Sequence, residues 1–345
     1  MSQTLEKIVQ RPGIKYHLVK TDKFKTNLLV LKIKAPLKKD AATLRSLLPN
    51  YLQSGTDTYP TMSELRSYLD DLYGAHFYAD LQKKGEYHII SLWLEVAGER
   101  FLTTSDPLLK KGLAFLAEVL LNPKKTGESF DPDTVQREKR TLKQRIQAIF
   151  DDKMRYANMR LVEEMCKNEP YSIPVYGVLE DVDPITPGML YGYYQKVLAE
   201  DEFDLYIVGD FDEEEVIGYC DELFPLKERT PEQIKNTDFG QAAGEKKIVE
   251  HQEVNQGKLN IGFRTNIRYG DADYFALQVF NGLFGGFPHS KLFMNVREKA
   301  SLAYYATSRL ESHKGLMMVM TGVEPKNYEK AVSIIQEQLE AMKKG

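Results

Sequence analysis

The sequence predicts an α+β fold with two related domains, each built from a mainly antiparallel sheet packed with helices. Three observations carry this prediction. The 345 residues suffice for two domains at about 100–200 residues each. The order strand, helix, helix, strand, strand, helix runs over residues 28–121 and starts again near residue 258, which indicates an internal duplication. Strands that follow one another without an intervening helix favour antiparallel pairing.

The elements of the first copy follow from the period of their apolar residues. Apolar and polar positions alternate over residues 28–34, which predicts a strand. Apolar residues recur every three or four positions over residues 40–53 and predict a helix, which Pro49 should bend or shorten. The first half is expected to contain further strands at 14–19, 75–81, 87–96 and 203–208, and further helices at 61–72, 107–121, about 133–167, about 189–198 and 213–223.

Residues 227–245 mark the best boundary between the copies, because this polar stretch contains Pro231 and has no sustained period. We therefore expect an N-terminal domain over 1–228, a linker over 229–246 and a C-terminal domain over 247–345. The elements expected after the linker are strands at 258–263, 303–309 and 315–321 and helices at 272–283, 289–299 and 328–342.

The second copy looks truncated. Nothing after residue 342 corresponds to the long helix, the further helix and the strand that follow residue 121 in the first copy. The sequence is thus expected to be a fragment or a truncated gene product. Such a half-domain should leave a sheet edge and an apolar helix face open, and we expect a partner to cover them.

Composition excludes several classes of protein. The 46 Lys and Arg balance 50 Asp and Glu, and no basic stripe of the kind that binds nucleic acid is present. No apolar run approaches the roughly 20 residues that span a bilayer, and residues 1–11 lack the apolar segment of a secretory signal. Cys166 and Cys220 form no CxxC pair. The expected class is a soluble, cytoplasmic globular protein.

Common catalytic motifs are missing from the sequence. It contains no GxSxG, and the glycine-rich residues 282–291 lack the spacing of a phosphate loop. No two of the six histidines lie three or four residues apart, as a helical zinc motif requires. His76 and His88 fall in strand patterns, where packing explains them more simply than metal binding does. The residues alone identify no catalytic centre.

A family resemblance covers nearly the whole chain. In the first half it rests on Gly55-Thr56, Tyr73-Gly74, Glu138, and segments of 170–187 and 206–210. The second half is similar to the pattern S-x-L-F-x-x-x-R-E-x-x-x-L-A-Y, which here runs from Ser290 to Tyr304. Both resemble the pitrilysin/insulinase family of metallopeptidases. The resemblance implies a clam-shell of two related domains around an internal chamber.

Active members of that family place an inverted zinc motif, HxxEH, on the first helix, with a further Glu ligand on a later helix. Here the motif positions fall on Ser46, Pro49 and Asn50, and the later ligand falls on Arg145 if Glu138 is the preceding family glutamate. Residues 40–57 contain no His or Glu at all. Because zinc needs about three protein donors, we expect no metal, no cofactor and no catalytic residue in this chain.

The resemblance assigns a different role to Arg297 and Tyr304. In the family such a pair faces the zinc and hydrogen-bonds the substrate backbone. The alternative is that Arg297 caps the end of its helix while Tyr304 packs in a strand. Some bacterial members divide the zinc motif and the Arg/Tyr pair between two homologous chains. This chain is similar to the second kind, and also to the metal-free subunits of mitochondrial processing peptidases.

Three functions stay open at this point. The chain could be the peptide-binding subunit of a heterodimer whose zinc-bearing homologous partner performs catalysis. It could be a proteolytically inactive peptide-binding or scaffold protein with the same fold. It could also be an enzyme of another kind that uses an unrecognised site. An Arg297→Ala substitution separates the first from the second, since only the first predicts a loss of peptidase activity in the assembled complex.

Overall fold

The computed structural model describes residues 6–103, 106–234 and 244–344. The chain folds into two compact units. Unit 1 comprises Met1–Lys83, Tyr87–Ile146 and Val175–Gln233, and unit 2 comprises Lys84–Glu86, Gln147–Pro174 and Ile234–Gly345. Within the described ranges, no helix has both the length and the apolar content needed to cross a bilayer.

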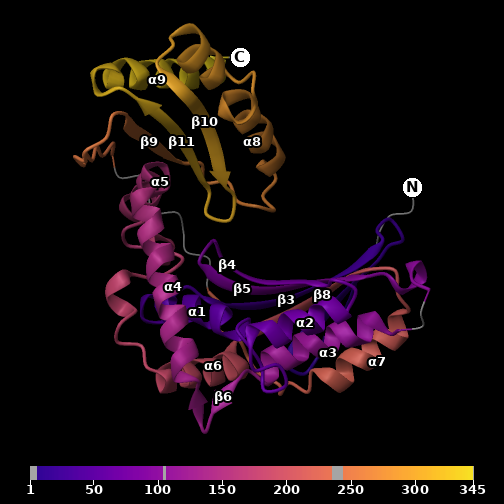
Figure 1. Cartoon of the computed structure of the whole chain (residues 1–345). Helices are drawn as coiled ribbons and strands as arrows, with labels where there is room; N and C mark the ends of the chain where they lie inside the picture. Colours follow the sequence, from indigo (N-terminus) through magenta and orange to yellow (C-terminus); the bar gives the residue numbers. More distant parts are fainter. Residues whose placement is uncertain (1–5, 104–105, 235–243, 345) are drawn as a thin grey trace. The chain divides into compact units, whose positions relative to one another are not determined.

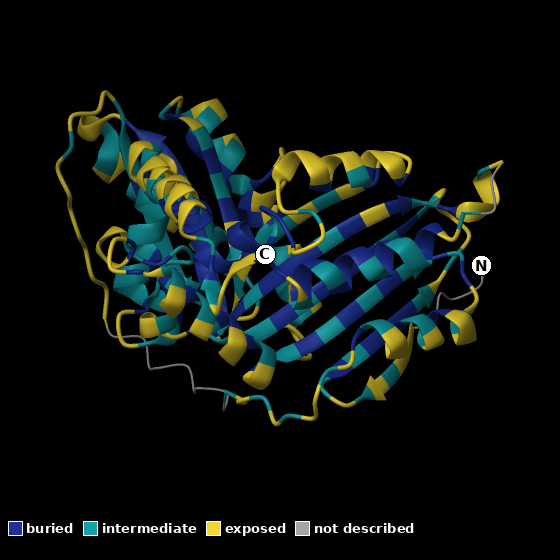
Figure 2. Ribbon diagram, turned by 60° about the horizontal axis from the view of Figure 1, so that its bottom comes forward, coloured by how far each residue is buried: buried dark blue, intermediate teal, exposed yellow. Residues whose placement is uncertain are grey.

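Unit 1 is built on a six-stranded sheet with the order β1-β2-β8-β3-β5-β4 (Figure 1). Strand β3 pairs antiparallel with both β5 and β8, whereas β2 runs parallel to β8. Along most strands buried and less buried residues alternate, as Figure 2 shows, because successive side chains point to opposite faces. The strands are β1 (Glu6–Arg11), β2 (Ile14–Lys20), β3 (Thr26–Pro36), β4 (His76–Lys84), β5 (Tyr87–Ala97) and β8 (Glu202–Gly209).

Helices cover one face of this sheet, and the main core lies between them and the inward residues of the strands. Leu29, Leu31 and Ile33 of β3 are fully buried there, beside Leu47 and Leu48 of the first helix. The helices of this part of the chain are α1 (Lys39–Leu52), α2 (Met62–Asp71), α3 (Leu108–Leu121), α4 (Pro132–Asp151), α6 (Pro187–Glu200) and α7 (Glu213–Leu223), with a small hairpin of β6 (Lys125–Thr126) and β7 (Ser129–Phe130).

Unit 2 repeats the central part of this plan. Its antiparallel sheet has the order β10-β11-β9, from β10 (Ala303–Glu311), β11 (Leu316–Val323) and β9 (Gly257–Arg264). A second core lies on one face, against α8 (Tyr274–Asn281), π-helical turns at Gly282–Gly286 and Phe293–Lys299, and α9 (Tyr328–Lys344). On the other face, Leu161 and Met165 of α5 (Lys153–Met165) pack against Leu316 and Met318. By order, β9, β11 and β10 correspond to β3, β5 and β4.

The α+β class is confirmed, and most predicted elements occur close to their expected bounds. The single helix predicted over about 133–167 is wrong, because it breaks at Asp152 into α4 and α5. Pro49 does not end its helix, which continues to Leu52. Strand β1 and the β6–β7 hairpin were not predicted, and one sheet pairing is parallel.

The domain bounds of 1–228 and 247–345 stay predictions. The two compact units differ from them, because Gln147–Pro174 belongs to unit 2. Of the linker expected over 229–246, residues 235–243 lie outside the described residues.

Candidate functional site

The three positions of the family's zinc motif lie on α1 and are buried. The Ser46 hydroxyl is within hydrogen-bond distance of the carbonyl oxygens of Thr43 (2.9 Å) and Tyr176 (3.0 Å). The Asn50 amide donates to the carbonyl of Ser46 at 3.4 Å. Pro49 has neither a donor nor a charge. The side chains of Ser46 and Asn50 therefore form hydrogen bonds with backbone carbonyl groups, as buried polar groups usually do.

A loop closes directly over this part of α1. Gly177 has a φ of +71°, a left-handed conformation that suits glycine. A Cβ added to Gly177 would lie only 2.0 Å from Thr43 Oγ1, so the loop backbone passes very close to Thr43. The backbone N–H of Val178 donates to the Thr43 hydroxyl at 3.4 Å. The turn brings the carbonyl of Tyr176 onto Ser46. The space beside the motif positions is thus filled by the chain itself.

The downstream positions on α4 are also engaged. The Ser54 hydroxyl lies 3.0 Å from Glu138 Oε1, and Arg137 Nε donates to the same oxygen at 2.9 Å. Arg145 places its guanidinium 5.3 Å from the centre of the Tyr176 ring, a cation–π contact. A cation therefore stands where active relatives are expected to hold an anionic ligand.

His76 and His88, two histidines of the first sheet, provide no substitute ligand set. His88 is fully buried, and burial, reinforced by the charge of Arg45, lowers the pKa of its imidazole to about 3. His76 is exposed on edge strand β4 and lies against Tyr78, with the ring centres 5.4 Å apart. Across the described part of the chain, no group of three or more His, Cys, Asp or Glu side chains could hold a metal ion.

In unit 2 the structure brings Arg297 and Tyr304 together. The guanidinium carbon lies 5.8 Å from the centre of the Tyr304 ring and 4.5 Å from that of Phe293. Buried Leu292 and Val296 anchor the helical turn that carries Arg297. Arg297 Nε lies 3.3 Å from a Glu298 carboxylate oxygen, and the arginine side chain is 41% exposed.

Tyr304 stands at an irregularity of β10. The register with β11 shifts between Ala303 and Ala306, and Ser301 just before the strand has a φ of +50°. A β-bulge of this kind redirects side chains from the regular alternation. The alternative for Tyr304 was that it packs in the strand. This alternative is wrong, because Tyr304 is 85% exposed. The family resemblance singled out the two residues, and the bulge accounts for the exposure of Tyr304.

Comparisons with known proteins identify the family. The chain is 54% identical over all 345 residues to "Probable inactive metalloprotease YmfF" of Bacillus subtilis strain 168 and covers 81% of that protein. This chain belongs to the M16 peptidase family. The family model described as the peptidase M16 inactive domain matches residues 184–345, a range that includes Arg297 and Tyr304. The resemblance to pitrilysin-type peptidases is confirmed.

Other similar proteins are more distant in sequence. The chain is 23% identical over 269 residues, 72% of its length and 65% of the relative's, to the subtilosin biosynthesis protein AlbE of B. subtilis strain 168. Among solved structures, a conserved protein from Enterococcus faecalis V583 has a TM-score of 0.87 at 36% identity, over 97% of this chain and 79% of that one. The M16 inactive domain from Pseudomonas fluorescens has a TM-score of 0.79 at 19% identity, over 98% and 79%.

The residues at the M16 zinc position do not fit a zinc ion. Zinc takes imidazole, thiolate or carboxylate donors at about 2 Å. Ser46, Pro49 and Asn50 offer a hydroxyl, a ring without a donor and a carboxamide, and both polar groups are already bonded to backbone. These three residues therefore cannot hold a catalytic zinc ion.

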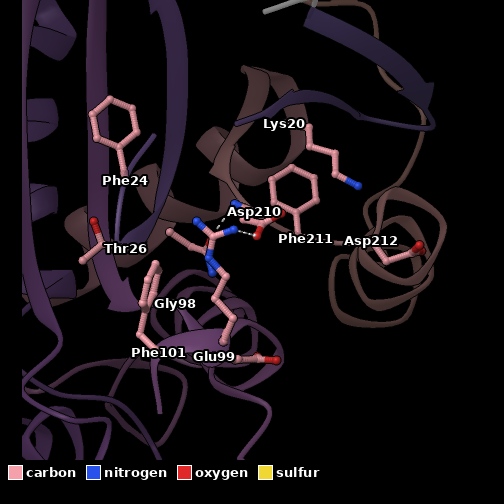
Figure 3. A pocket seen from close by; sticks show the side chains of 11 residues that line it. Lys20, Phe24, Thr26, Gly98, Glu99, Phe101, Asp210, Phe211 and Asp212 are labelled. Atoms are coloured by element: carbon pink, nitrogen blue, oxygen red, sulfur yellow. Dashed lines mark hydrogen bonds and ion pairs between the residues drawn. The ribbon is translucent and has the colours of Figure 1, made fainter. Parts of the chain in front are cut away.

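One cavity of unit 1 carries no sequence signal. It is a half-open hollow of about 360 Å³ near the ends of β2, β5 and β8. Its lining includes Phe24 and Phe101, which are labelled in Figure 3, and the ion pair of Arg100 and Asp210, whose atoms are 2.6 Å apart. Its residues come from separate stretches of the chain without a shared motif, so sequence reasoning could not find it.

Proposed function

We propose that this chain is the non-catalytic, peptide-binding subunit of a two-chain zinc metallopeptidase, assembled as a heterodimer with a homologous subunit that bears HxxEH. The observation that carries the proposal is the contrast between its two halves. The motif positions of α1 provide no zinc ligand, whereas Arg297 and Tyr304 lie together and accessible in unit 2. The names of the M16 relatives, inactive metalloprotease and inactive domain, agree with a chain that lacks its own metal.

In this proposal the chain binds and orients the peptide. A guanidinium carries five N–H donors and a phenol one O–H, and both can donate to the carbonyl oxygen of a peptide bond. Donors placed there also stabilise the negative charge that develops on that oxygen during hydrolysis. Zinc held by the partner subunit would supply the activated water. Contact with Phe293 and the ion pair with Glu298 limit the freedom of Arg297 before substrate arrives.

The test begins with the partner. Pull-down from the source cell should recover a co-purifying chain with an intact HxxEH, and the two chains together should cleave peptides. Arg297→Ala is expected to lower kcat/KM of the complex about 100-fold or more, as the loss of an oxyanion donor does. Arg309→Ala, at an exposed arginine of β10, is the matched control and should leave activity unchanged.

A second pair of variants tests the phenol. Tyr304→Phe removes only the hydroxyl, and Tyr269→Phe does the same at another exposed tyrosine of unit 2. Loss of activity in Tyr304→Phe alone, with assembly intact in both, supports the proposal. Full activity in Arg297→Ala and Tyr304→Phe would favour the scaffold function. Stoichiometric zinc in the isolated chain, or chelator-sensitive hydrolysis by it alone, would contradict the proposal directly.

A further inference from the structure

The half-open hollow of unit 1 lies where three strands of the sheet end together. Strands β2, β5 and β8 run in the same direction, because β2 is parallel to β8 and both β5 and β8 are antiparallel to β3. Their carboxyl ends therefore share one edge of the sheet. There the segments 20–27, 98–101 and 210–212 border a space of about 360 Å³, which we call the strand-end hollow. This volume is at the lower end of the range for small-molecule sites.

Hydrogen bonds hold the three segments together without a ligand. The backbone N–H of Gly98 donates to the carbonyl of Lys25 at 2.8 Å, and the N–H of Asp210 donates to Asn27 Oδ1 at 3.0 Å. Gly209 permits this approach, since a Cβ on it would lie 1.9 Å from Asn27 Oδ1. The strand-end hollow is thus preformed, as ligand sites usually are.

Phenylalanine rings give the strand-end hollow its apolar part. Phe24 is 57% exposed and Phe101 is 47% exposed, whereas Phe211 is buried; all three are labelled in Figure 3. The guanidinium carbon of Arg100 lies 4.7 Å from the centre of the Phe101 ring and holds that ring by a cation–π contact. Rings that stay accessible at a preformed hollow can stack on another aromatic ring or meet its edge.

The charged side chains of the lining differ in how far they are engaged. Asp210 pairs with Arg100 at 2.6 Å. Glu99 and Asp212 each use one carboxylate oxygen to accept a backbone hydrogen bond, at 2.9 Å near the start of α3 and at 3.0 Å at the start of α7. Lys20 has no hydrogen-bond or ion-pair partner among the described residues. Two cations thus face three carboxylates, and the lining offers both signs of charge to a ligand.

Lys20 and Asp212 are the pair best placed to bind such a ligand. Both are exposed and line the hollow, but they form no ion pair with each other within the described part of the chain. A carboxylate would accept hydrogen bonds from the Lys20 ammonium, and an ammonium would donate to the second oxygen of Asp212. A molecule with both groups satisfies both side chains, whereas a singly charged molecule satisfies only one.

We propose that the strand-end hollow binds a small zwitterion that carries an aromatic ring. An aromatic α-amino acid has this chemistry, and so does a dipeptide with one aromatic side chain. Its carboxylate would lie at Lys20, its ammonium at Asp212, and its ring against the phenylalanines. This inference does not depend on the proposed function, because Arg297 and Tyr304 take no part in it.

Ligand-observed NMR on the purified 345-residue chain tests the chemistry with matched probes. Phenylalanine should bind saturably, with a dissociation constant of about 1 mM or tighter. Phenethylamine lacks the carboxylate and hydrocinnamate lacks the ammonium, so each should bind at least about threefold more weakly. The dipeptide phenylalanylalanine distinguishes the two sources of the ligand. Tighter binding of the dipeptide than of phenylalanine identifies a peptide ligand, and the reverse order identifies a free amino acid.

Variants place the binding in the strand-end hollow. Lys20→Gln should weaken phenylalanine binding at least about threefold. Lys23→Gln is the matched control, because Lys23 is an exposed lysine of the same turn that does not line the hollow, and it should change affinity less than about 1.5-fold. Asp212→Asn removes the second charge but keeps an acceptor for the start of α7, and it should also weaken binding about threefold.

A pair of phenylalanine variants tests the apolar part. Phe24→Leu should weaken binding about threefold, because a ring contact is lost. Phe150→Leu, at a phenylalanine of α4 with 45% exposure outside the hollow, should have no effect. The proposal is overturned if phenylalanine shows no saturable binding, or if either singly charged probe binds as tightly. It is also overturned if Lys20→Gln and Lys23→Gln have equal effects.

Discussion

At the residue scale, the tightest constraint around the M16 motif positions is a residue without a side chain. A Cβ added to Gly177 would lie 2.0 Å from Thr43 Oγ1 and 2.8 Å from the α-carbon of Thr43. Its φ of +71° is also unfavourable for any residue with a Cβ. The loop that fills the side of α1 therefore depends on glycine for two independent reasons.

We expect Gly177→Ala to lower the free energy of unfolding by about 3 kcal/mol or more, from backbone strain and overpacking together. Urea denaturation followed by circular dichroism measures this. Gly127→Ala is the control, because Gly127 has a similar φ of +64° but nothing within 4 Å of an added Cβ. It should cost only about 1–2 kcal/mol. Equal losses in the two variants would show that the contact with Thr43 is unimportant.

At the element scale, the break between α4 and α5 is set by one cap. Asp152 lies just outside α5, and its Oδ1 accepts hydrogen bonds from the backbone N–H groups of Met154 and Arg155, both at 3.1 Å. These donors have no partner within the helix. The sequence pattern did not reveal this cap, because the spacing of apolar and charged residues continues through position 152 and Asp is also common on exposed helix faces.

Asp152→Ala should therefore destabilise unit 2, to which α5 belongs, by about 1 kcal/mol. Asp152→Asn keeps an acceptor and should restore most of the loss. The neighbouring Asp151→Ala removes a carboxylate without removing the cap and serves as control. Thermal unfolding of the four proteins gives the comparison, and equal midpoints for Asp152→Ala and Asp151→Ala would refute the role of the cap.

At the scale of the whole molecule, a buried ion cluster gathers distant parts of the chain into unit 2. Lys314, only 3% exposed, pairs with Glu86 and with Glu169, whose Oε2 is 2.6 Å from its ammonium nitrogen. Arg264 pairs with the other oxygen of Glu169. Burial opposes ionisation of Glu169, but hydrogen bonds and attraction from Arg264 and Lys314 together hold its pKa below the usual value.

This shift determines how the stability of unit 2 depends on pH. A carboxylate whose pKa is lower in the folded state than in the unfolded state stabilises the folded state. This stabilisation is fully present above the unfolded-state pKa of about 4.3, and it is lost as the pH falls through the folded-state pKa. We expect unfolding midpoints to be flat at neutral pH and to drop in acid. Lys314→Met should flatten the acid slope and cost about 3–5 kcal/mol at neutral pH, because carboxylates lose a buried partner.

Lys326→Met, at a lysine with 77% side-chain exposure, is the control for this experiment. Its unfolding curve should match the wild type within about 0.5 kcal/mol at every pH. An unchanged acid slope in Lys314→Met would mean that other carboxylates govern the pH dependence.

Residue identity alone settled much of the chemistry of this protein. Whether α1 can hold zinc depends on which donor atoms occupy positions 46, 49 and 50, and the sequence alone gives the residues at these positions. The α+β class and the repeated order of elements follow from periodicity, because a local period sets which face of a helix or strand is apolar. Arg297 and Tyr304 were singled out by the family resemblance.

The packing of distant segments against one another decided the rest. The exposure of Tyr304 depends on a bulge in the pairing of β10 with β11, and the Lys314 cluster joins residues more than 200 positions apart. That no residue of α8 is buried stands out only beside α1, in which ten of fourteen residues are buried. Local periodicity reports which residues are apolar, whereas register, ion pairing and coverage depend on which surfaces meet in three dimensions, and only the folded chain brings those surfaces together.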